Sequence, residues 1–411
     1  MQCIDCKDLF YLIRETLKLF DRRPIVHGGK VAYYVYKMLQ YEKEFGKKTD
    51  IENFELADIV FLTTFHDIGA YKTDNIDQMI QFETKTPRAH SVYGHLFLEK
   101  MTPFGDLAKV ILYHHTDYTE LSSLGFEFSE LASYINFAEA VDIFRESLGD
   151  KFGFEIFEKN VGKKFSPEAF DLFKKANTQY KLFEQISSGD YKQEINELMD
   201  FFILSNDDKE KLLVFLMFTL SLKSDIIVKN TAICMALCEK LGIIMKLNGD
   251  QLKILRYAAC VHDIGYIAFN KEWLSKPPDL SSPYLEKLAQ HTVLMEQLLK
   301  DKMKRDVIVT AATHHERIDG KGYPRRLTEK QLNLSQLLLQ FADGIAATIV
   351  STTDKEAIIA KVKRQTESGW FSPAITKLFL TRYDDIMPYV EERSAEILED
   401  LIKINEQYET V

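Results

Sequence analysis

Pairs of adjacent metal-binding residue types recur along this 411-residue chain. His-Asp occurs at 66–67 and 262–263, and His-His occurs at 114–115 and 314–315. Imidazole nitrogen combined with carboxylate oxygen suits divalent iron, manganese, nickel or zinc. An Asp beside a His can bridge two ions, and two neighbouring ions can activate a nucleophile and offset charge during an in-line phosphoryl displacement. These residue types therefore predict metal centres for phosphoryl chemistry.

The pairs belong to an internal repeat with the same order and closely similar spacing in both halves. The matched segments are FHDIGA (65–70) with VHDIGY (261–266), YHHTD (113–117) with THHER (313–317), and FSPEAFDLF (165–173) with FSPAITKLF (371–379). The repeat predicts two copies of one domain. The expected boundaries are 1–180 for the N-terminal domain, 181–204 for the linker and 205–411 for the C-terminal domain.

Nine of the ten histidines fall in this repeated pattern, and only His95 lies outside it. A single such histidine is better explained as a core residue, but the repeated set is better explained by metal binding. A carboxylate follows each His-His pair in an apolar helical segment, Glu139 in the first repeat and Asp343 in the second. The predicted histidine ligands are His27, His66, His90, His114 and His115, then His262, His291, His314 and His315.

The segments that carry these residues read as helices. Apolar residues recur at helical spacing over 8–20 and 391–404, and Pro and Gly fall between such segments. The sequence therefore predicts an all-α protein. A net charge of −10 argues against a broad DNA, RNA or anionic-membrane surface. Five cysteines and no recognisable signal peptide predict a cytoplasmic protein with reduced thiols.

The order His, His-Asp, His, His-His, carboxylate on successive helices resembles the HD superfamily of metal-dependent phosphohydrolases. HDIG followed by HHERIDGKGYP, at 262–265 and 314–324, resembles its HD-GYP branch. That resemblance spans both repeats and implies two tandem HD-type helical domains. It also implies hydrolysis of a cyclic dinucleotide, chiefly cyclic di-GMP, with Asp67 or Asp263 bridging two metal ions.

In the first repeat the implied ligand set is complete, with His27 supplied by the opening helix. The last ligand is Glu139 where the family has Asp, and Asp142 is a competing candidate three residues later. The family's GYP loop is absent after His115. Ala70 replaces the signature lysine, for which Lys72 is a substitute candidate. We expect two metal ions here.

The second repeat has the opposite defect. Alignment places Ile227 where the first repeat has His27, and Asp225 substitutes only if the helix start shifts. Tyr266 replaces the signature lysine, so we expect one metal ion or none. The loop itself is intact and predicts phosphate contacts. Its expected substrate-binding residues are Arg317, Lys321, Tyr323, Arg325 and Arg326.

The sequence therefore predicts an iron- or manganese-dependent cyclic dinucleotide phosphodiesterase, with nickel and zinc as alternatives. One rival is a non-catalytic nucleotide sensor derived from such an enzyme. Another is an HD phosphohydrolase acting on a different nucleotide, which the GYP loop argues against. The expected partners are the cyclic dinucleotide and either a second copy of the chain or a signalling protein. We expect hydrolysis to depend on the first repeat.

Overall fold

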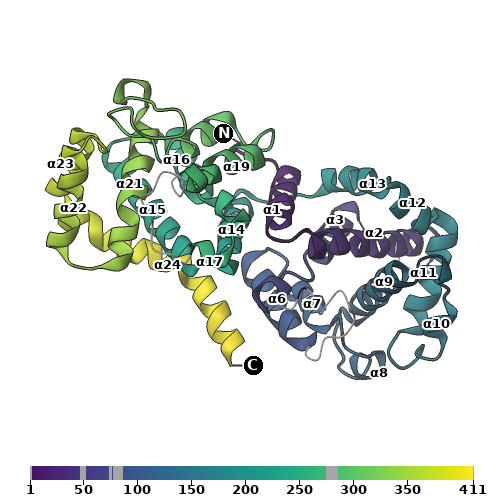
Figure 1. Ribbon diagram of the computed structural model, residues 1–411. Coiled ribbons are helices and arrows are strands. Elements are labelled where there is room, and N and C mark those ends of the chain that lie inside the picture. The colour runs from purple at the N-terminus through teal and green to yellow at the C-terminus, as the bar shows by residue number, and fades with distance from the viewer. Residues whose placement is uncertain (1, 47–51, 74–75, 77–86, 275–285, 411) are drawn as a thin grey trace. The chain divides into compact units, whose positions relative to one another are not determined.

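The computed structural model describes residues 2–46, 52–73, 76, 87–274 and 286–410, and it is helical in both halves (Figure 1). Over these residues no sheet is formed, and the extended pairings are isolated bridges such as Ile4 with Met303. The predicted all-α class is confirmed.

The chain divides into two compact units, each of which includes a terminal segment distant in sequence. Unit 1 comprises Met1–Phe20 and Lys209–Ile402, and unit 2 comprises Asp21–Asp208 and Lys403–Val411. Both units differ from the boundaries expected from the repeat. The first helix, α1 (Cys6–Phe20), belongs with the second half of the sequence, and the expected linker 181–204 is helical within unit 2. Helical periodicity predicts an amphipathic helix without identifying the surface that covers it.

Unit 2 is built around α2, which packs against α3, α9 and α11, while α7 packs against α6 and α9. The Asp21 carboxylate caps α2 by accepting a hydrogen bond from the backbone N–H of Arg23 at 2.9 Å. The main helices of this unit are α2 (Arg22–Phe45), α3 (Asn53–Thr64), α4 (Ala70–Thr73), α6 (Pro87–Met101), α7 (Lys109–Tyr113), α9 (Ser129–Leu148), α11 (Pro167–Tyr180), α12 (Leu182–Ser188) and α13 (Tyr191–Leu198).

Unit 1 repeats this arrangement, with α15 packed against α16 and α21, and α20 packed against α16 and α21. Capping boxes begin α16 at Asn248 and α21 at Asn333. Its main helices are α1, α14 (Asn206–Phe218), α15 (Asp225–Ile244), α16 (Gly249–Val261), η5 (Ile264–Ala268), α19 (Gln290–Leu299), α20 (Arg305–Ala311), α21 (Leu334–Ser351), α22 (Lys355–Glu367), α23 (Pro373–Thr381) and α24 (Tyr383–Glu409), whose last residues belong to unit 2.

The repeated Phe-Ser-Pro motif marks the start of a helix in each unit. Ser166 and Ser372 are the residues before α11 and α23, and each is followed by Pro at the first helical position. The Ser166 hydroxyl accepts a hydrogen bond from the backbone N–H of Ala169, whereas the Ser372 hydroxyl donates to Glu329 at 2.6 Å. The motif therefore reports helix geometry and not catalytic chemistry.

The glycine of each HDIG motif allows two backbone segments to approach closely. A Cβ atom on Gly69 would lie 2.0 Å from the carbonyl oxygen of His90, and one on Gly265 would lie 2.0 Å from that of His291. Any larger residue would separate the HD turn from the next histidine-bearing helix, α6 or α19. These glycines therefore set the spacing between neighbouring ligands.

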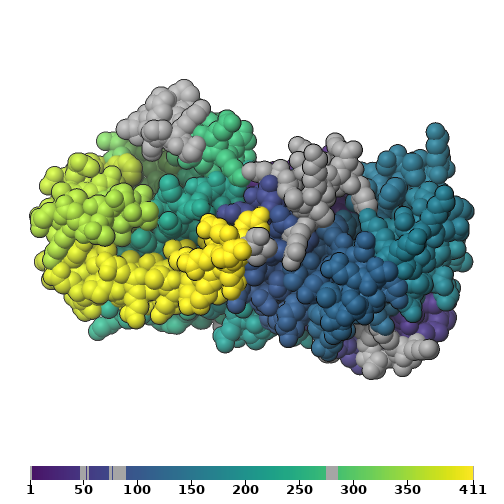
Figure 2. Space-filling model, turned by 90° about the horizontal axis from the view of Figure 1, so that it is seen from below, coloured from purple at the N-terminus to yellow at the C-terminus, as the bar shows by residue number. Residues whose placement is uncertain are grey.

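Helix α21 is the one described helix long and apolar enough to cross a membrane, and 61% of it is buried within the protein. Core helices of globular domains pass the same test, so α21 is explained by its place in unit 1. At the surface of this unit, α24 lies beside α22 (Figure 2), where the Lys355 ammonium pairs with the Asp384 carboxylate at 2.6 Å.

Candidate metal centres

Unit 2 brings all seven of its predicted ligands into two groups. Within each group the ligand atoms lie within 4.8 Å of one another. The ligands come from the second turn of α2, the turn that follows α3, α6, the end of α7, and the middle of α9. One group is Asp67, His90, His114 and His115, and the other is His27, His66 and Glu139.

Asp67 lies between the two groups. Its Oδ2 is 3.2 Å from His66 Nε2, and its Oδ1 is 3.6 Å from His90 Nε2 and 3.9 Å from His114 Nε2. The Nε2 atoms of His90 and His115 also face one another at 2.9 Å. A carboxylate with one oxygen directed to each group has the geometry needed to bridge two ions.

The chain fixes the orientation of several imidazoles through the backbone. Their Nδ1–H groups donate to the carbonyl oxygen three residues earlier, which leaves Nε2 directed into the centre. This contact measures 2.8 Å from His66 to Thr63, 2.6 Å from His114 to Ile111, 2.8 Å from His262 to Ala259, 2.5 Å from His291 to Leu288 and 2.6 Å from His314 to Ala311.

The ligand atoms of unit 2 fit a bound metal because they otherwise lack partners. Both Asp67 oxygens and the Nε2 atoms of His27, His66 and His114 are buried without a hydrogen-bond partner. Each such buried polar atom costs about 1–3 kcal/mol when unsatisfied. Divalent cations coordinated by these nitrogen and oxygen donors would remove that cost.

The electrostatics of the centre also fit cation binding. Burial, and then the neighbouring His66 and His90 rings, lowers the pKa of His114 to about 3, so this ring is neutral and can coordinate. Burial, and then the nearby Asp67 carboxylate, raises the pKa of Glu139 to about 7. A divalent cation would favour the ionised form of Glu139, so metal binding is expected to release protons.

Asp142 has a different role from the one considered from sequence. Its Oδ2 accepts a hydrogen bond from His27 Nδ1 at 2.8 Å, while its Oδ1 lies 3.5 Å from the Lys30 ammonium. It therefore stands behind His27, on the side away from the unpartnered Nε2, whereas Glu139 lies in the group with His27 and His66. Asp142 is a positioning residue of the kind that raises the basicity of a ligating histidine.

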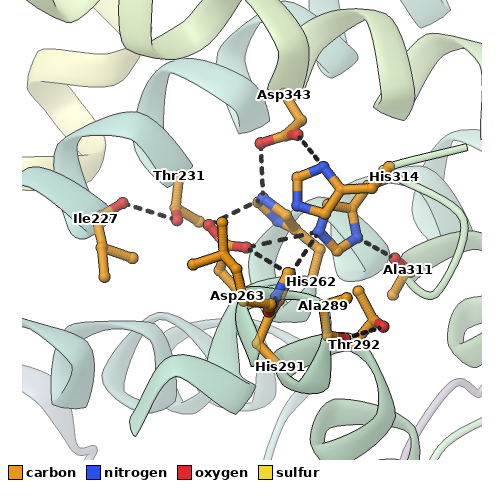
Figure 3. Close-up of polar contacts among 12 residues, drawn as sticks. Ile227, Thr231, His262, Asp263, Ala289, His291, Thr292, Ala311, His314 and Asp343 are labelled. Carbon is orange, nitrogen blue, oxygen red and sulfur yellow. Dashed lines mark hydrogen bonds and ion pairs between the residues drawn. The ribbon is translucent and has the colours of Figure 1, made fainter. Parts of the chain in front are cut away.

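Unit 1 also assembles its predicted ligands, but in a smaller set (Figure 3). The two groups are His291, His314 and His315, and His262, Asp263 and His314. His314 is shared between them. Asp343 lies 3.5 Å from His262 Nε2 through one oxygen and 3.4 Å from His315 Nδ1 through the other. Side chains from α19, from α21 and from the turns after α16 and α20 therefore converge on one centre.

Unit 1 has no counterpart of His27 and none of Asp142, the residue that positions His27 in unit 2. Ile227 on α15 stands where unit 2 has His27, and its backbone carbonyl accepts the Thr231 hydroxyl at 2.9 Å (Figure 3). Aligning Asp343 with Glu139 places Ala346 where unit 2 has Asp142. Asp225 is exposed and does not join either ligand group formed by the described residues. Unit 1 thus lacks the ligand and its support together.

The GYP loop of unit 1 is shaped by Glu316, which the sequence analysis did not single out. This carboxylate is fully buried and accepts the backbone N–H groups of Arg325 at 2.6 Å and Leu327 at 2.8 Å. The Tyr323 ring lies against the His315 ring, with 4.7 Å between centroids. A carboxylate directly after a metal-ligand pair was the available signal for Glu316, because a buried carboxylate requires several donors.

The cations predicted to bind substrate differ from one another in exposure and in their contacts. Lys321 is 76% exposed, Arg326 is exposed with a left-handed backbone (φ 57°), and Arg325 pairs with Glu296. Lys72, the substitute candidate of unit 2, lies with its ammonium 5.8 Å from the centre of the Tyr93 ring.

Replacement of the signature lysine in unit 1 produces an aromatic contact with the metal site. The Tyr266 ring stacks on the His291 ring, with 4.1 Å between centroids and 13° between planes. The position that would have carried a cation therefore covers a predicted ligand with an apolar surface.

Comparison with known proteins agrees with this geometry. Residues 215–374 match the family described as HD domain. The chain is 25% identical over 364 residues to 3'3'-cGAMP-specific phosphodiesterase 1 of Vibrio cholerae, covering 84% of this chain and 83% of the relative. The chain therefore carries an HD domain and is similar over most of its length to a cyclic dinucleotide phosphodiesterase. These matches confirm the enzyme class predicted from sequence, a metal-dependent phosphohydrolase, and they agree with the predicted HD-type resemblance.

Other phosphodiesterases match over a shorter region. A cyclic di-GMP phosphodiesterase of Thermotoga maritima is 32% identical over 134 residues, which is 31% of this chain and 36% of that protein. The crystal structure of a cyclic GMP-AMP specific phosphodiesterase of V. cholerae superposes with a TM-score of 0.56 at 13% identity. The match covers 93% of this chain and 98% of that chain, and it supports the all-α, HD-type fold.

Asp142→Ala is expected to weaken metal binding at one of the two positions of unit 2 by about 10- to 100-fold, the usual effect of losing a partner of a ligating histidine. Manganese titration of the metal-free full chain measures this directly. Lys30→Met is the matched control, because it removes the other contact of Asp142 and leaves the His27 hydrogen bond intact. Wild-type affinity in Asp142→Ala would show that His27 does not depend on this carboxylate.

Proposed function

We propose that this protein hydrolyses a phosphodiester bond of a cyclic dinucleotide at the centre of unit 2. The observation that carries the proposal is the position of Asp67 between two complete ligand groups, with both oxygens lacking hydrogen-bond partners. Water adds to phosphorus, and the ester oxygen leaves as a ribose hydroxyl. The product is a linear dinucleotide with a terminal phosphate.

The proposed metal ligands of this centre are the seven side chains of its two groups. When bound, two divalent ions would supply activation of the nucleophile and charge stabilisation at the leaving oxygen. The chain itself holds the geometry. The Thr63 and Ile111 carbonyls fix two of the rings, and Asp142 fixes His27. Iron or manganese is proposed for both positions.

The relatives support a cyclic dinucleotide substrate and suggest two candidates. The relative aligned over 84% of this chain is named for 3'3'-cGAMP, whereas cyclic di-GMP phosphodiesterases such as that of T. maritima align over about a third of it. The longer alignment includes unit 2, so we propose 3'3'-cGAMP as a substrate beside cyclic di-GMP.

Unit 1 is proposed to bind nucleotide through its GYP loop. Its cationic loop and its reduced ligand set support a binding role, with one ion held by the histidines around Asp263. Under this assignment, unit 1 has the role of a non-catalytic nucleotide sensor, and unit 2 has the catalytic role.

Turnover by the manganese- or iron-loaded full chain tests the proposed activity. We expect conversion of cyclic di-GMP or 3'3'-cGAMP to a linear dinucleotide, with loss of activity after chelation and recovery on reloading. Nucleoside monophosphates are the control substrates, because a general HD phosphohydrolase would release phosphate from them. Release of phosphate from monophosphates with both cyclic dinucleotides unchanged would contradict the proposal.

A further inference from the structure

Arg317 and Trp370 form an ordered stack beside the GYP loop of unit 1. The guanidinium carbon of Arg317 lies 4.8 Å from the centre of the indole ring. The guanidinium also donates to Asp319 at 3.0 and 2.6 Å and to the Ser368 carbonyl at 2.8 Å. Three of its five N–H donors are thus used within the protein, which holds the guanidinium plane in place.

Both members of the stack are connected to the metal centre of unit 1, Arg317 through the chain and Trp370 through hydrogen bonds. Arg317 is two residues from His315 in the chain. The Trp370 carbonyl accepts hydrogen bonds from the Ile318 N–H at 3.3 Å and from Gln340 Nε2 at 3.0 Å. Gln340 precedes Asp343 by three residues on α21, so the two side chains share one face of that helix.

The Trp370 side of the stack is also partly exposed to solvent. Trp370 is 37% exposed, although its backbone is held on both sides, since its N–H donates to the Gln365 carbonyl at 2.9 Å. Nucleobases stack on aromatic rings and on guanidinium planes, and the arrangement presents both.

Unit 2 has the same backbone pairing but not the stack. There the Tyr118 N–H donates to the Lys164 carbonyl at 3.0 Å, which is the counterpart of the bond from Ile318 to Trp370. Lys164 therefore takes the place of Trp370, and Asp117 takes the place of Arg317. The aromatic and cationic pair is specific to the unit that carries the GYP loop.

We propose that the Arg317–Trp370 stack is the surface on which a purine base of the cyclic dinucleotide packs when its phosphate reaches the GYP loop of unit 1. The inference rests on the nucleotide-binding role proposed for that unit. It changes the role expected for Arg317 from phosphate contact to base contact, and it leaves the exposed Lys321 as a phosphate-facing cation. Stacking accepts either guanine or adenine, so this surface contributes affinity and not discrimination between them.

Tryptophan fluorescence provides a local test, because Trp273 is the other tryptophan of the chain. The Trp273→Phe variant, in an Asp67→Ala background that limits turnover in unit 2, is titrated with cyclic di-GMP and with 3'3'-cGAMP. We expect saturable quenching of Trp370 by both nucleotides and none by ribose 5-phosphate, which lacks a base. Calorimetry on the same samples reports binding independently of the fluorophore.

The affinity of the same protein is then compared across substitutions at position 370. Trp370→Ala is expected to raise the dissociation constant about 10- to 100-fold, and Trp370→Phe to recover most of the loss because it keeps an aromatic face. Metal content and circular dichroism should match wild type in both. Nucleotide binding by calorimetry without quenching, or with equal affinity in Trp370→Ala, would overturn the stacking role alone. Absence of any nucleotide binding would overturn the proposed binding role of unit 1 together with it.

Discussion

Asp67→Ala is expected to lower the rate of cyclic dinucleotide hydrolysis by at least about 10²- to 10³-fold, the loss typical when one electrostatic contribution to a transition state is removed. The reason is geometric. Among the described residues of unit 2, Asp67 is the carboxylate whose two oxygens face different ligand groups, at 3.2 Å from His66 Nε2 and 3.6 Å from His90 Nε2. Without it the histidines can still hold ions, but nothing joins them.

The matched substitution in the other unit is Asp263→Ala. Asp263 occupies the same place in its repeat, with its oxygens 3.3 Å from His262 Nε2 and 3.7 Å from His291 Nε2. We expect this variant to lose metal from unit 1 and to keep appreciable turnover, with weaker substrate affinity. Initial rates over a range of substrate concentrations separate these effects. Full activity in Asp67→Ala together with an inactive Asp263→Ala would reverse the assignment of the two units.

Removal of the metal is expected to destabilise unit 2 as well as to stop turnover. Ions that bind only the folded protein stabilise it by about 4 kcal/mol when their free concentration is about 1,000 times the dissociation constant. Chelation also leaves the oxygens of Asp67 and several Nε2 atoms buried without partners. Calorimetry should therefore show an unfolding transition that moves to lower temperature on chelation and returns on reloading.

Comparison with Asp67→Ala shows whether this shift comes from unit 2. In that variant the metal-dependent shift should be much smaller, because the carboxylate that lies between the two groups is gone. In Asp263→Ala the shift should persist. An equal shift in wild type and Asp67→Ala would place the stabilising ions outside the centre described for unit 2.

Most of the candidate metal ligands could be predicted from the alignment of the two sequence repeats. Because each His-Asp and His-His pair recurs in order, the sequence could predict which residues converge. The structure gathers all of the predicted ligands of unit 2, and those of unit 1 except Asp343, within two groups in each unit. The all-α class followed from helical periodicity. The Phe-Ser-Pro motif could be read as a helix start from its types alone, with Ser before the helix and Pro at its first position.

Other features depend on tertiary contacts that periodicity does not encode. The sequence treated Asp142 as an alternative ligand to Glu139, because residues three apart share a helix face. In the structure the two carboxylates have different neighbours. Asp142 accepts a hydrogen bond from His27 Nδ1, whereas Glu139 lies in the group with His27 and His66. The packing of α1 within unit 1 was similarly hidden, because an amphipathic helix does not identify its partner.

The roles of Glu316 and Arg317 could not be predicted from the sequence for a related reason. Both lie in a loop whose conformation is set by backbone hydrogen bonds, including two that Glu316 accepts. Residue type alone indicated a phosphate-binding cation at Arg317. Its contacts with Asp319 and Trp370 depend on the path of the loop past residues 368–370, which no local pattern predicts.

The most direct test of the account is to locate the metal by anomalous X-ray scattering from crystals of the manganese- or iron-loaded full chain. The account predicts two peaks in unit 2 on either side of Asp67, about 3.5–4 Å apart as in two-metal sites, and at most one peak beside Asp263. Two peaks around Asp263, with one or none around Asp67, would contradict the assignment of the two-metal centre to unit 2.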